Sequence, residues 1–111
     1  MGLSTHILDT SLGRPAAGIS LHLAKLVADT WRDAGSGSTD ADGRCKTLLA
    51  DAAFEAATYR IRFATDSYFA AQGRTCLYPY VDIVFTVTDP AQHYHIPLLL
   101  TANGYTTYRG S

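Results

Sequence analysis

The amino-acid sequence predicts an all-β fold, a β-sandwich, on three observations. Apolar and polar residues alternate with a period of two along most of the chain, which is the pattern of half-buried strands. About seven or eight such segments fit into 111 residues, with turn-forming residues between them. Apolar residues make up 47% of the chain, an ordinary share for a globular protein. We therefore expect a single domain over residues 1–111.

The first half of the chain contains two clear strands. In residues 3–9 the odd-numbered side chains are expected on one face, and Ser4 and His6 on the other. After a turn-rich connection, residues 19–26 alternate in the same way, with the apolar odd-numbered residues inward. Residues 32–44 (RDAGSGSTDADGR) are rich in Gly, Ser and Asp and predict a loop, with at most a short strand at its end.

The second half of the chain predicts four more strands and one helix. The strands are expected over residues 58–64, 80–87, 93–100 and 105–109. A short helix is expected over residues 67–72, with Thr65 or Asp66 as N-cap and Gly73 as its stop. Residues 49–57 are Ala-rich, but no second helix is predicted there because the neighbouring segments all alternate.

The last two strands are expected to form a hairpin. If Asn-Gly at 103–104 is a two-residue turn, Pro97 faces Gly110 and Ser111 ends beside His95. A longer loop would shift this register. The final residues of the sequence are therefore expected to run back towards a histidine.

Charge and hydropathy exclude several classes of function. The net charge is −1 and the pI is about 6.4, so nothing favours nucleic acid or an anionic membrane. The longest apolar run, IPLLL, is too short to span a bilayer, and the first residues do not resemble a signal peptide. We expect a cytoplasmic protein. Cys45 and Cys76 lack a CxxC partner and are expected to be free thiols.

Four residues are candidates for chemistry. His6 lies in a strand otherwise suited to a core, where histidine is usually structural but is also the commonest general base. Arg44 follows a tight turn, and its guanidinium can donate two parallel hydrogen bonds to a planar group, or form a surface ion pair. His93 and His95 share one face of a strand, and such a pair can bind a metal if His6 or a carboxylate completes the site.

The order of motifs adds a resemblance that spans nearly the whole chain. LSTHILDTSLGRPAAGISLHL, TDADGR, YPYVDIVFTV and HYHIPLLLTANGYTTYRGS closely resemble the transthyretin-related 5-hydroxyisourate hydrolases. The histidine of the first strand and the final YRGS are specific to these hydrolases, because transthyretin, the hormone-carrying relative, lacks these polar groups. The resemblance implies a β-sandwich of two four-stranded sheets with one short helix. It also implies a homotetramer in which the sheets face each other across a central channel.

The resemblance further implies an activity, the hydrolysis of 5-hydroxyisourate to 2-oxo-4-hydroxy-4-carboxy-5-ureidoimidazoline in urate degradation, without metal or cofactor. Water would attack the C6 carbonyl and the N1–C6 bond would open. A non-catalytic carrier of small ligands, as in transthyretin, is the alternative. The resemblance implies that the catalytic residues are His6, Arg44, His95, Tyr108 and Ser111. It implies that the substrate-binding residues are His6, Arg44, Tyr108, Arg109, Gly110 and Ser111.

Overall fold

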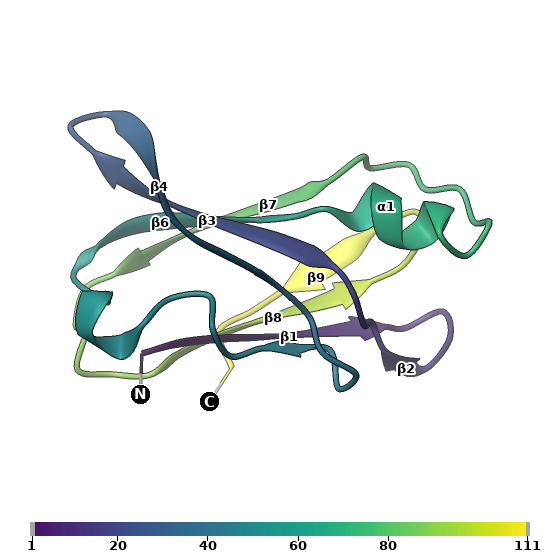
Figure 1. The fold of residues 1–111 in the computed structure, drawn as a ribbon, viewed down its shortest axis with the longest axis horizontal. Coiled ribbons are helices and arrows are strands. Elements are labelled where there is room, and N and C mark those ends of the chain that lie inside the picture. Colours follow the sequence, from purple (N-terminus) through teal and green to yellow (C-terminus); the bar gives the residue numbers. More distant parts are fainter. Residues whose placement is uncertain (1, 111) are drawn as a thin grey trace.

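The protein is a two-layer β-sandwich in a computed structural model that describes residues 2–110 (Figure 1). The strands are β1 (Leu3–Asp9), β2 (Arg14–Pro15), β3 (Ser20–Val27), β4 (Thr30–Ser38), β5 (Arg44–Cys45), β6 (Ala57–Phe63), β7 (Val81–Val87), β8 (Tyr94–Leu100) and β9 (Tyr105–Thr107). One sheet has the order β4-β3-β6-β7, and the other β2-β1-β8-β9. The expected sandwich is confirmed, and a fifth short strand, β5, is added to the second sheet along β1.

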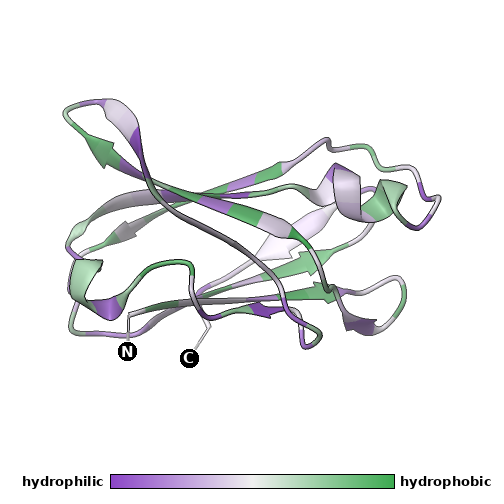
Figure 2. Ribbon diagram, viewed as in Figure 1, coloured by the Kyte–Doolittle hydropathy of each residue, from purple (hydrophilic) through white to green (hydrophobic). Residues whose placement is uncertain are grey.

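The core lies between the sheets and follows the predicted alternation. In β1 the odd-numbered residues are buried and the even-numbered ones are partly exposed. The same alternation places Leu23, Ile61 and Leu98 in the core, each with no exposed surface. Hydrophobic and hydrophilic residues accordingly alternate along the ribbon of the strands (Figure 2). Burying each such side chain contributes about 1.5–3 kcal/mol, which makes the sandwich the preferred fold.

The first and the penultimate long strands lie side by side and run parallel (Figure 1). Leu3 pairs with Tyr94, and the register continues without a break to the other end of both strands. The buried hydroxyl of Thr5 donates a hydrogen bond of 2.6 Å to the carbonyl oxygen of Ile96 across this pair. Outward-facing residues of β1 and β8 therefore become close neighbours, although about 90 residues separate them in the sequence.

The prediction of a loop over residues 32–44 is wrong for the first half of this segment, because strand β4 occupies Thr30–Ser38. Gly35 and Gly37 explain the error. A Cβ at Gly35 would overlap the carbonyl oxygen of Leu48, and one at Gly37 would lie 2.8 Å from the sulfur of Cys45. These glycines allow the chain to pass close beneath the strand and do not mark a turn.

The hairpin register is also wrong by two residues. Leu98 pairs with Thr107, and Leu100 with Tyr105, so the turn is longer than the Asn-Gly dipeptide. The N–H of Thr101 donates to the carbonyl of Gly104 and closes the longer turn. Because the shift is even, the residues keep the faces predicted for them.

The helix α1 spans Thr65–Ala70 and begins two residues before its expected start. Its N-cap is Ala64, without a side-chain hydrogen bond, so the predicted caps are wrong. Gly73 has a φ of +65° and follows the helix as expected. The Ala-rich segment 49–57 contains the short 3₁₀ helix η1 (Asp51–Ala53) and no α-helix, and β6 begins at its last residue. No helix in residues 2–110 is long and apolar enough to cross a membrane.

A buried carboxylate fastens α1 and the following turn to β1. Asp9 has no exposed surface and accepts hydrogen bonds of 2.8 Å from the Tyr68 hydroxyl and the Arg74 guanidinium. Its other oxygen accepts the N–H groups of Ser11 and Leu12. Burial raises the pKa of Asp9. The hydrogen bonds that Asp9 accepts, of which the bond from Arg74 has the largest effect, outweigh burial and leave the pKa below its usual value. The carboxylate is therefore charged and fully paired.

We predict that Asp9→Ala lowers the free energy of unfolding by about 3 kcal/mol, because it leaves Tyr68 and Arg74 without their buried acceptor. Urea denaturation at a fixed protein concentration measures this change. Asp82→Ala is the control, since it removes a more exposed partner of Arg62 and should cost about 1 kcal/mol or less. Equal losses in the two variants would contradict the assignment.

Candidate active site

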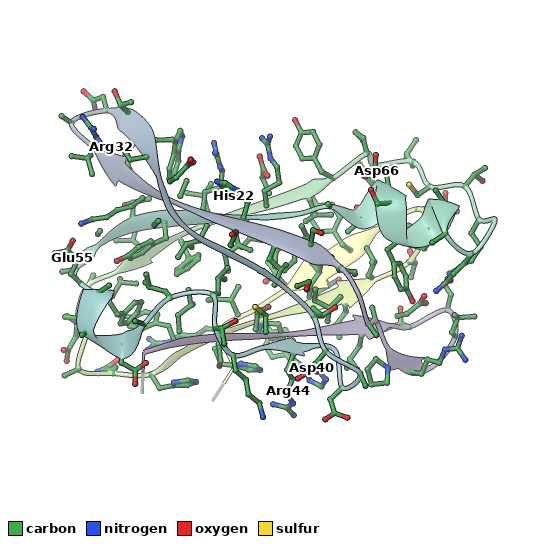
Figure 3. The ribbon with its side chains drawn as sticks, in the orientation of Figure 1. His22, Arg32, Asp40, Arg44, Glu55 and Asp66 are labelled. Atoms are coloured by element: carbon green, nitrogen blue, oxygen red, sulfur yellow. The ribbon has the colours of Figure 1, made fainter. Side chains whose placement is uncertain are left out.

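His6 and Arg44 meet on the outer face of the β1 sheet. Strand β5 pairs with β1 so that Arg44 lies directly opposite His6. Arg44 projects away from the sandwich, on the side opposite to His22 (Figure 3). The Nε2 of His6 lies 2.8 Å from the carbonyl oxygen of Asp42. A carbonyl oxygen only accepts, so Nε2 carries the proton, and in the neutral ring Nδ1 keeps a lone pair.

The loop before β5 fixes the backbone of Arg44. One carboxylate oxygen of Asp40 accepts the N–H groups of Asp42 and Arg44, at 2.9 and 3.0 Å. These hydrogen bonds lower the pKa of Asp40, and the bond from the N–H of Arg44 has the largest effect. Gly43 has a φ of +76° and lies so close to β1 that a Cβ would overlap the carbonyl oxygen of Ile7. The loop sequence thus places the guanidinium at the sheet edge.

His95 is oriented by a serine of the neighbouring strand. Ser4 lies directly opposite His95 in the parallel pair, so both side chains leave the sheet on the outer face. The Ser4 hydroxyl lies 2.8 Å from Nδ1 of His95 and also 2.8 Å from Nε2 of His93. The two imidazole rings are nearly parallel, at 16°, with their centroids 6.4 Å apart. The hydrogen bond of His95 to Ser4 uses Nδ1, and no hydrogen bond joins its Nε2 to another residue within 2–110.

The surroundings of His95 favour its neutral form. Burial lowers its pKa below the usual value, and the electrostatic influence of the neighbouring His93, Arg44 and His6 lowers it further. Strand pairing places Arg44 opposite His6 and His95 opposite Ser4, and Ser4 and His6 share one face of β1. A neutral imidazole can accept a proton, which a general base must do.

Gly110 packs directly against His95. Its N–H donates a hydrogen bond of 2.8 Å to the carbonyl of His95, in an isolated antiparallel bridge. A Cβ at this position would overlap Cδ2 of the imidazole ring. Only glycine therefore lets the end of the described chain lie against the histidine.

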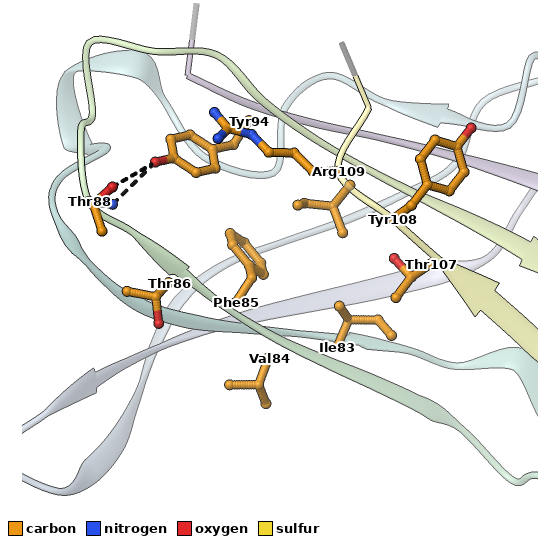
Figure 4. Close-up of a pocket in the computed structure, with 10 residues that line it drawn as sticks. Ile83, Val84, Phe85, Thr86, Thr88, Tyr94, Thr107, Tyr108 and Arg109 are labelled. Atoms are coloured by element: carbon orange, nitrogen blue, oxygen red, sulfur yellow. Dashed lines mark hydrogen bonds between the residues drawn. The ribbon is translucent and has the colours of Figure 1, made fainter.

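Three further residues of the final motif, Tyr108, Arg109 and Ser111, were also expected at the site. The guanidinium of Arg109 lies 4.1 Å from the ring centre of Tyr94 and donates to Gln92. Tyr108 is 54% exposed, and no described hydrogen bond joins it to the histidines. Tyr108 and Arg109 instead line a groove between the edges of β7 and β9 (Figure 4). Ser111 lies outside the described residues, so the roles expected for these three residues stay predictions.

The alternative metal site at His93 and His95 has no third protein ligand among the described residues. His93 and His95 both direct a nitrogen towards Ser4. Within residues 2–110, no group of three or more His, Cys, Asp or Glu side chains could hold a metal ion. Cys45 and Cys76 are free thiols, as expected.

Comparison with known proteins gives the family. The model of the HIUase/Transthyretin family matches residues 3–110. This chain belongs to that family. It is 44% identical to a 5-hydroxyisourate hydrolase of Mus musculus, over 98% of this chain and 94% of that protein. A 5-hydroxyisourate hydrolase of Mesorhizobium japonicum is also 44% identical, over 98% of this chain and 91% of that protein.

Solved structures of both branches of the family share the fold. Sea bream transthyretin in complex with thyroxine has a TM-score of 0.94 and 33% identity, over 99% of this chain and 95% of that chain. The 5-hydroxyisourate hydrolase of Klebsiella pneumoniae has a TM-score of 0.87 and 33% identity, over the full length of both chains. Backbone similarity therefore does not distinguish a transthyretin that binds thyroxine from a 5-hydroxyisourate hydrolase.

Sequence reasoning gave no role to Ser4 or to the carbonyl of Asp42. Ser4 is two residues before His6 on the same face, and this spacing was a visible signal. Its partner His95 was not identifiable, because the pairing of β1 with β8 depends on the whole fold. The Asp42 carbonyl leaves no signal in the sequence, since every residue has one.

We predict that Gly110→Ala displaces the His95 ring and breaks its hydrogen bond to Ser4, because the new Cβ overlaps the imidazole. A crystal structure, or the ¹⁵N shifts of His95, would show the displacement. The control is Gly104→Ala in the same hairpin, where the nearest atom, in Thr101, lies 3.8 Å from the new Cβ. An unchanged His95 ring in Gly110→Ala would contradict the prediction.

Proposed function

We propose that this chain hydrolyses 5-hydroxyisourate in the degradation of urate. Its relatives in mouse and in bacteria carry that name. The observation that carries the proposal is the cluster of His6, Arg44 and His95 on one outer sheet face. The alternative is a carrier for an apolar hormone. Binding an apolar ligand over His6, Arg44 and His95 would bury three polar groups, which costs free energy and adds no affinity.

The proposed reaction is the opening of a cyclic amide. Water attacks the C6 carbonyl, the N1–C6 bond breaks, and 2-oxo-4-hydroxy-4-carboxy-5-ureidoimidazoline forms. The enzyme must take a proton from water, stabilise the oxyanion that develops on the carbonyl oxygen, and return a proton to the leaving nitrogen.

The two imidazoles are suited to the proton transfers. Neutral His6 has a lone pair on Nδ1, because its Nε2 donates to Asp42. His95 offers Nε2, because its Nδ1 faces Ser4. In our proposal they divide the acid and base roles, each worth about 10²–10⁴-fold in rate.

The cation is suited to the charge that develops. Arg44 lies directly opposite His6 in the strand pair, so its guanidinium can orient the planar substrate and stabilise the oxyanion. We assign Tyr108 and Ser111 to fixing the water, and Arg109 to substrate binding. Gly110 lets the chain approach His95. No metal or cofactor enters the proposal, because imidazole and guanidinium groups supply the required charges.

We further propose that the active unit is a homotetramer in the cytoplasm. Arg44, which lies opposite His6, projects away from the sandwich (Figure 3), and in our proposal a second copy encloses the cluster. Strands β7 and β9 each pair along one edge only in the described chain. Val84 on β7 is 57% exposed, and Tyr108, the residue after β9, is 54% exposed. Such edges favour pairing with another copy.

The test of the proposed function is an ultraviolet assay of freshly generated 5-hydroxyisourate. The protein should accelerate the decay, and His95→Gln or Arg44→Gln should each lower kcat/KM by about 10²-fold or more. His22→Gln is the control, because His22 lies on the other sheet and pairs with Asp33, and it should stay within about twofold of the parent.

Two further measurements use the same preparation. Activity should survive EDTA, and light scattering should give the mass of a tetramer. If 5-hydroxyisourate decays at the same rate with and without protein, the proposed hydrolase activity is refuted. Loss of activity in EDTA would refute the metal-free mechanism. A fully active monomer would refute the proposal that a second copy encloses the site.

The pH dependence of kcat/KM follows from the lowered pKa of His95. Because the neutral ring is the active form, and its pKa lies below the usual value of about 6.5, activity should persist to pH values below about 6.5 before it falls. A profile recorded between pH 5 and 9 (about the range where histidine titrates) tests this. An acid limb centred above about 6.5 would contradict the predicted direction.

A further inference from the structure

The Ser4 hydroxyl links two histidines that would otherwise be independent. It lies 2.8 Å from both Nδ1 of His95 and Nε2 of His93. A hydroxyl has one proton to donate and two lone pairs to accept with. When one ring accepts the serine proton, the other ring must donate to the serine oxygen. The protonation of the two rings is therefore coupled through Ser4.

Each of the two arrangements gives His95 a different chemical role. When Nδ1 of His95 donates to Ser4, and Ser4 donates to His93, the Nε2 of His95 has a lone pair and can act as a base. When His93 donates to Ser4, and Ser4 donates to His95, the proton of neutral His95 is on Nε2 and the ring can act as an acid. The same three residues thus support both halves of an acid–base cycle.

We infer that Ser4 and His93 form a proton relay behind His95, which lets His95 take a proton from water and later return one to the leaving nitrogen. This inference rests on the proposed hydrolysis. Ser4 and His93 do not touch the reacting atoms in this scheme, so they are positioning residues that act through His95.

The proton transfers balance within the three side chains. When Nε2 of His95 takes a proton from water, Nδ1 gives its own proton to Ser4, and Ser4 passes its original proton to Nε2 of His93. His93 then carries the positive charge, and His95 is neutral with its proton on Nε2. The reverse sequence delivers that proton to the departing nitrogen and restores the starting state.

The electrostatic surroundings agree with this direction of transfer. Burial disfavours a protonated His95, and the neighbouring His93, Arg44 and His6 disfavour it further. These groups come from β1, from β5 and from the segment before β8, and Gly110 packs against the ring from the end of the hairpin. Arg109 is a further cation close to His93, because it donates to the backbone carbonyl of His93 and lies over Tyr94. Burial therefore disfavours a second proton that stays on His95, and Ser4 offers a path by which one can leave the ring.

Tautomers of the neutral rings give a direct test that does not require activity. In ¹H–¹⁵N spectra of the ¹⁵N-histidine protein at pH 8, one Ser4-facing nitrogen should be protonated and the other bare, and Ser4→Ala should abolish this relation. Protonation of both facing nitrogens, or neutral tautomers that do not change in Ser4→Ala, would overturn the relay.

Kinetics provide the second test. Ser4→Ala should lower kcat about 10–100-fold with KM within about threefold, because the relay affects proton transfer and not binding. Ser4→Thr keeps a hydroxyl on a residue that strands tolerate well, and should recover most of kcat. His93→Gln keeps a hydrogen-bonding group but cannot take up a proton, and should match Ser4→Ala.

The double variant and the control separate a relay from general damage. Ser4→Ala with His93→Gln should be no slower than either single variant by more than about twofold, since each already breaks the chain. His22→Gln, a histidine removed from the opposite sheet, should leave kcat unchanged. Additive losses would overturn the relay, as would full activity in His93→Gln. If the parent protein itself does not hydrolyse 5-hydroxyisourate, the proposed function fails, and the spectra alone decide the coupling.

Discussion

The parallel pairing of β1 with β8 is the constraint on which the site depends. Its inner face buries Ile7 and Leu98 completely, and Thr5 adds a buried hydrogen bond to the backbone of β8. Its outer face aligns Ser4 with His95. A slip of one residue would exchange the two faces, so the apolar packing that stabilises the core also fixes the imidazole beside its serine. Core stability and site geometry are consequences of one register.

The hairpin from β8 to β9 adds a steric constraint to this register. It returns the chain so that Gly110 lies against the ring of His95, where a side chain has no room. On the other side of β1, the loop before β5 holds Arg44 through the Asp40 carboxylate and positions the Asp42 carbonyl for His6. Each polar group is thus held by backbone geometry, which limits its motion and favours a preorganised site.

The strands were predictable from the sequence because a period of two is a local property, visible in β1 and β8 alike. Local reasoning failed where a distant partner decides the conformation. In the sequence the glycines at 35 and 37 indicate a loop. In the structure they lie in a strand, where Leu48 and Cys45 leave no room for a Cβ. The hairpin register likewise depended on the length of a turn. The candidates His6, Arg44 and His95 were found by residue type and motif, whereas Ser4 needed the tertiary pairing to gain a role.

The two faces of the sheets explain how one fold serves a carrier and an enzyme. Sea bream transthyretin has a TM-score of 0.94 to this chain at 33% identity, so most residues can change while the backbone is kept. Inward residues are restricted, because a change of volume in the core costs several kcal/mol. Outward residues such as His6 and Ser4 are partly exposed and bear little of that cost. Replacement of a few outward side chains can therefore create or remove a reaction site without altering the sandwich, and the activity of a family member has to be argued from those positions.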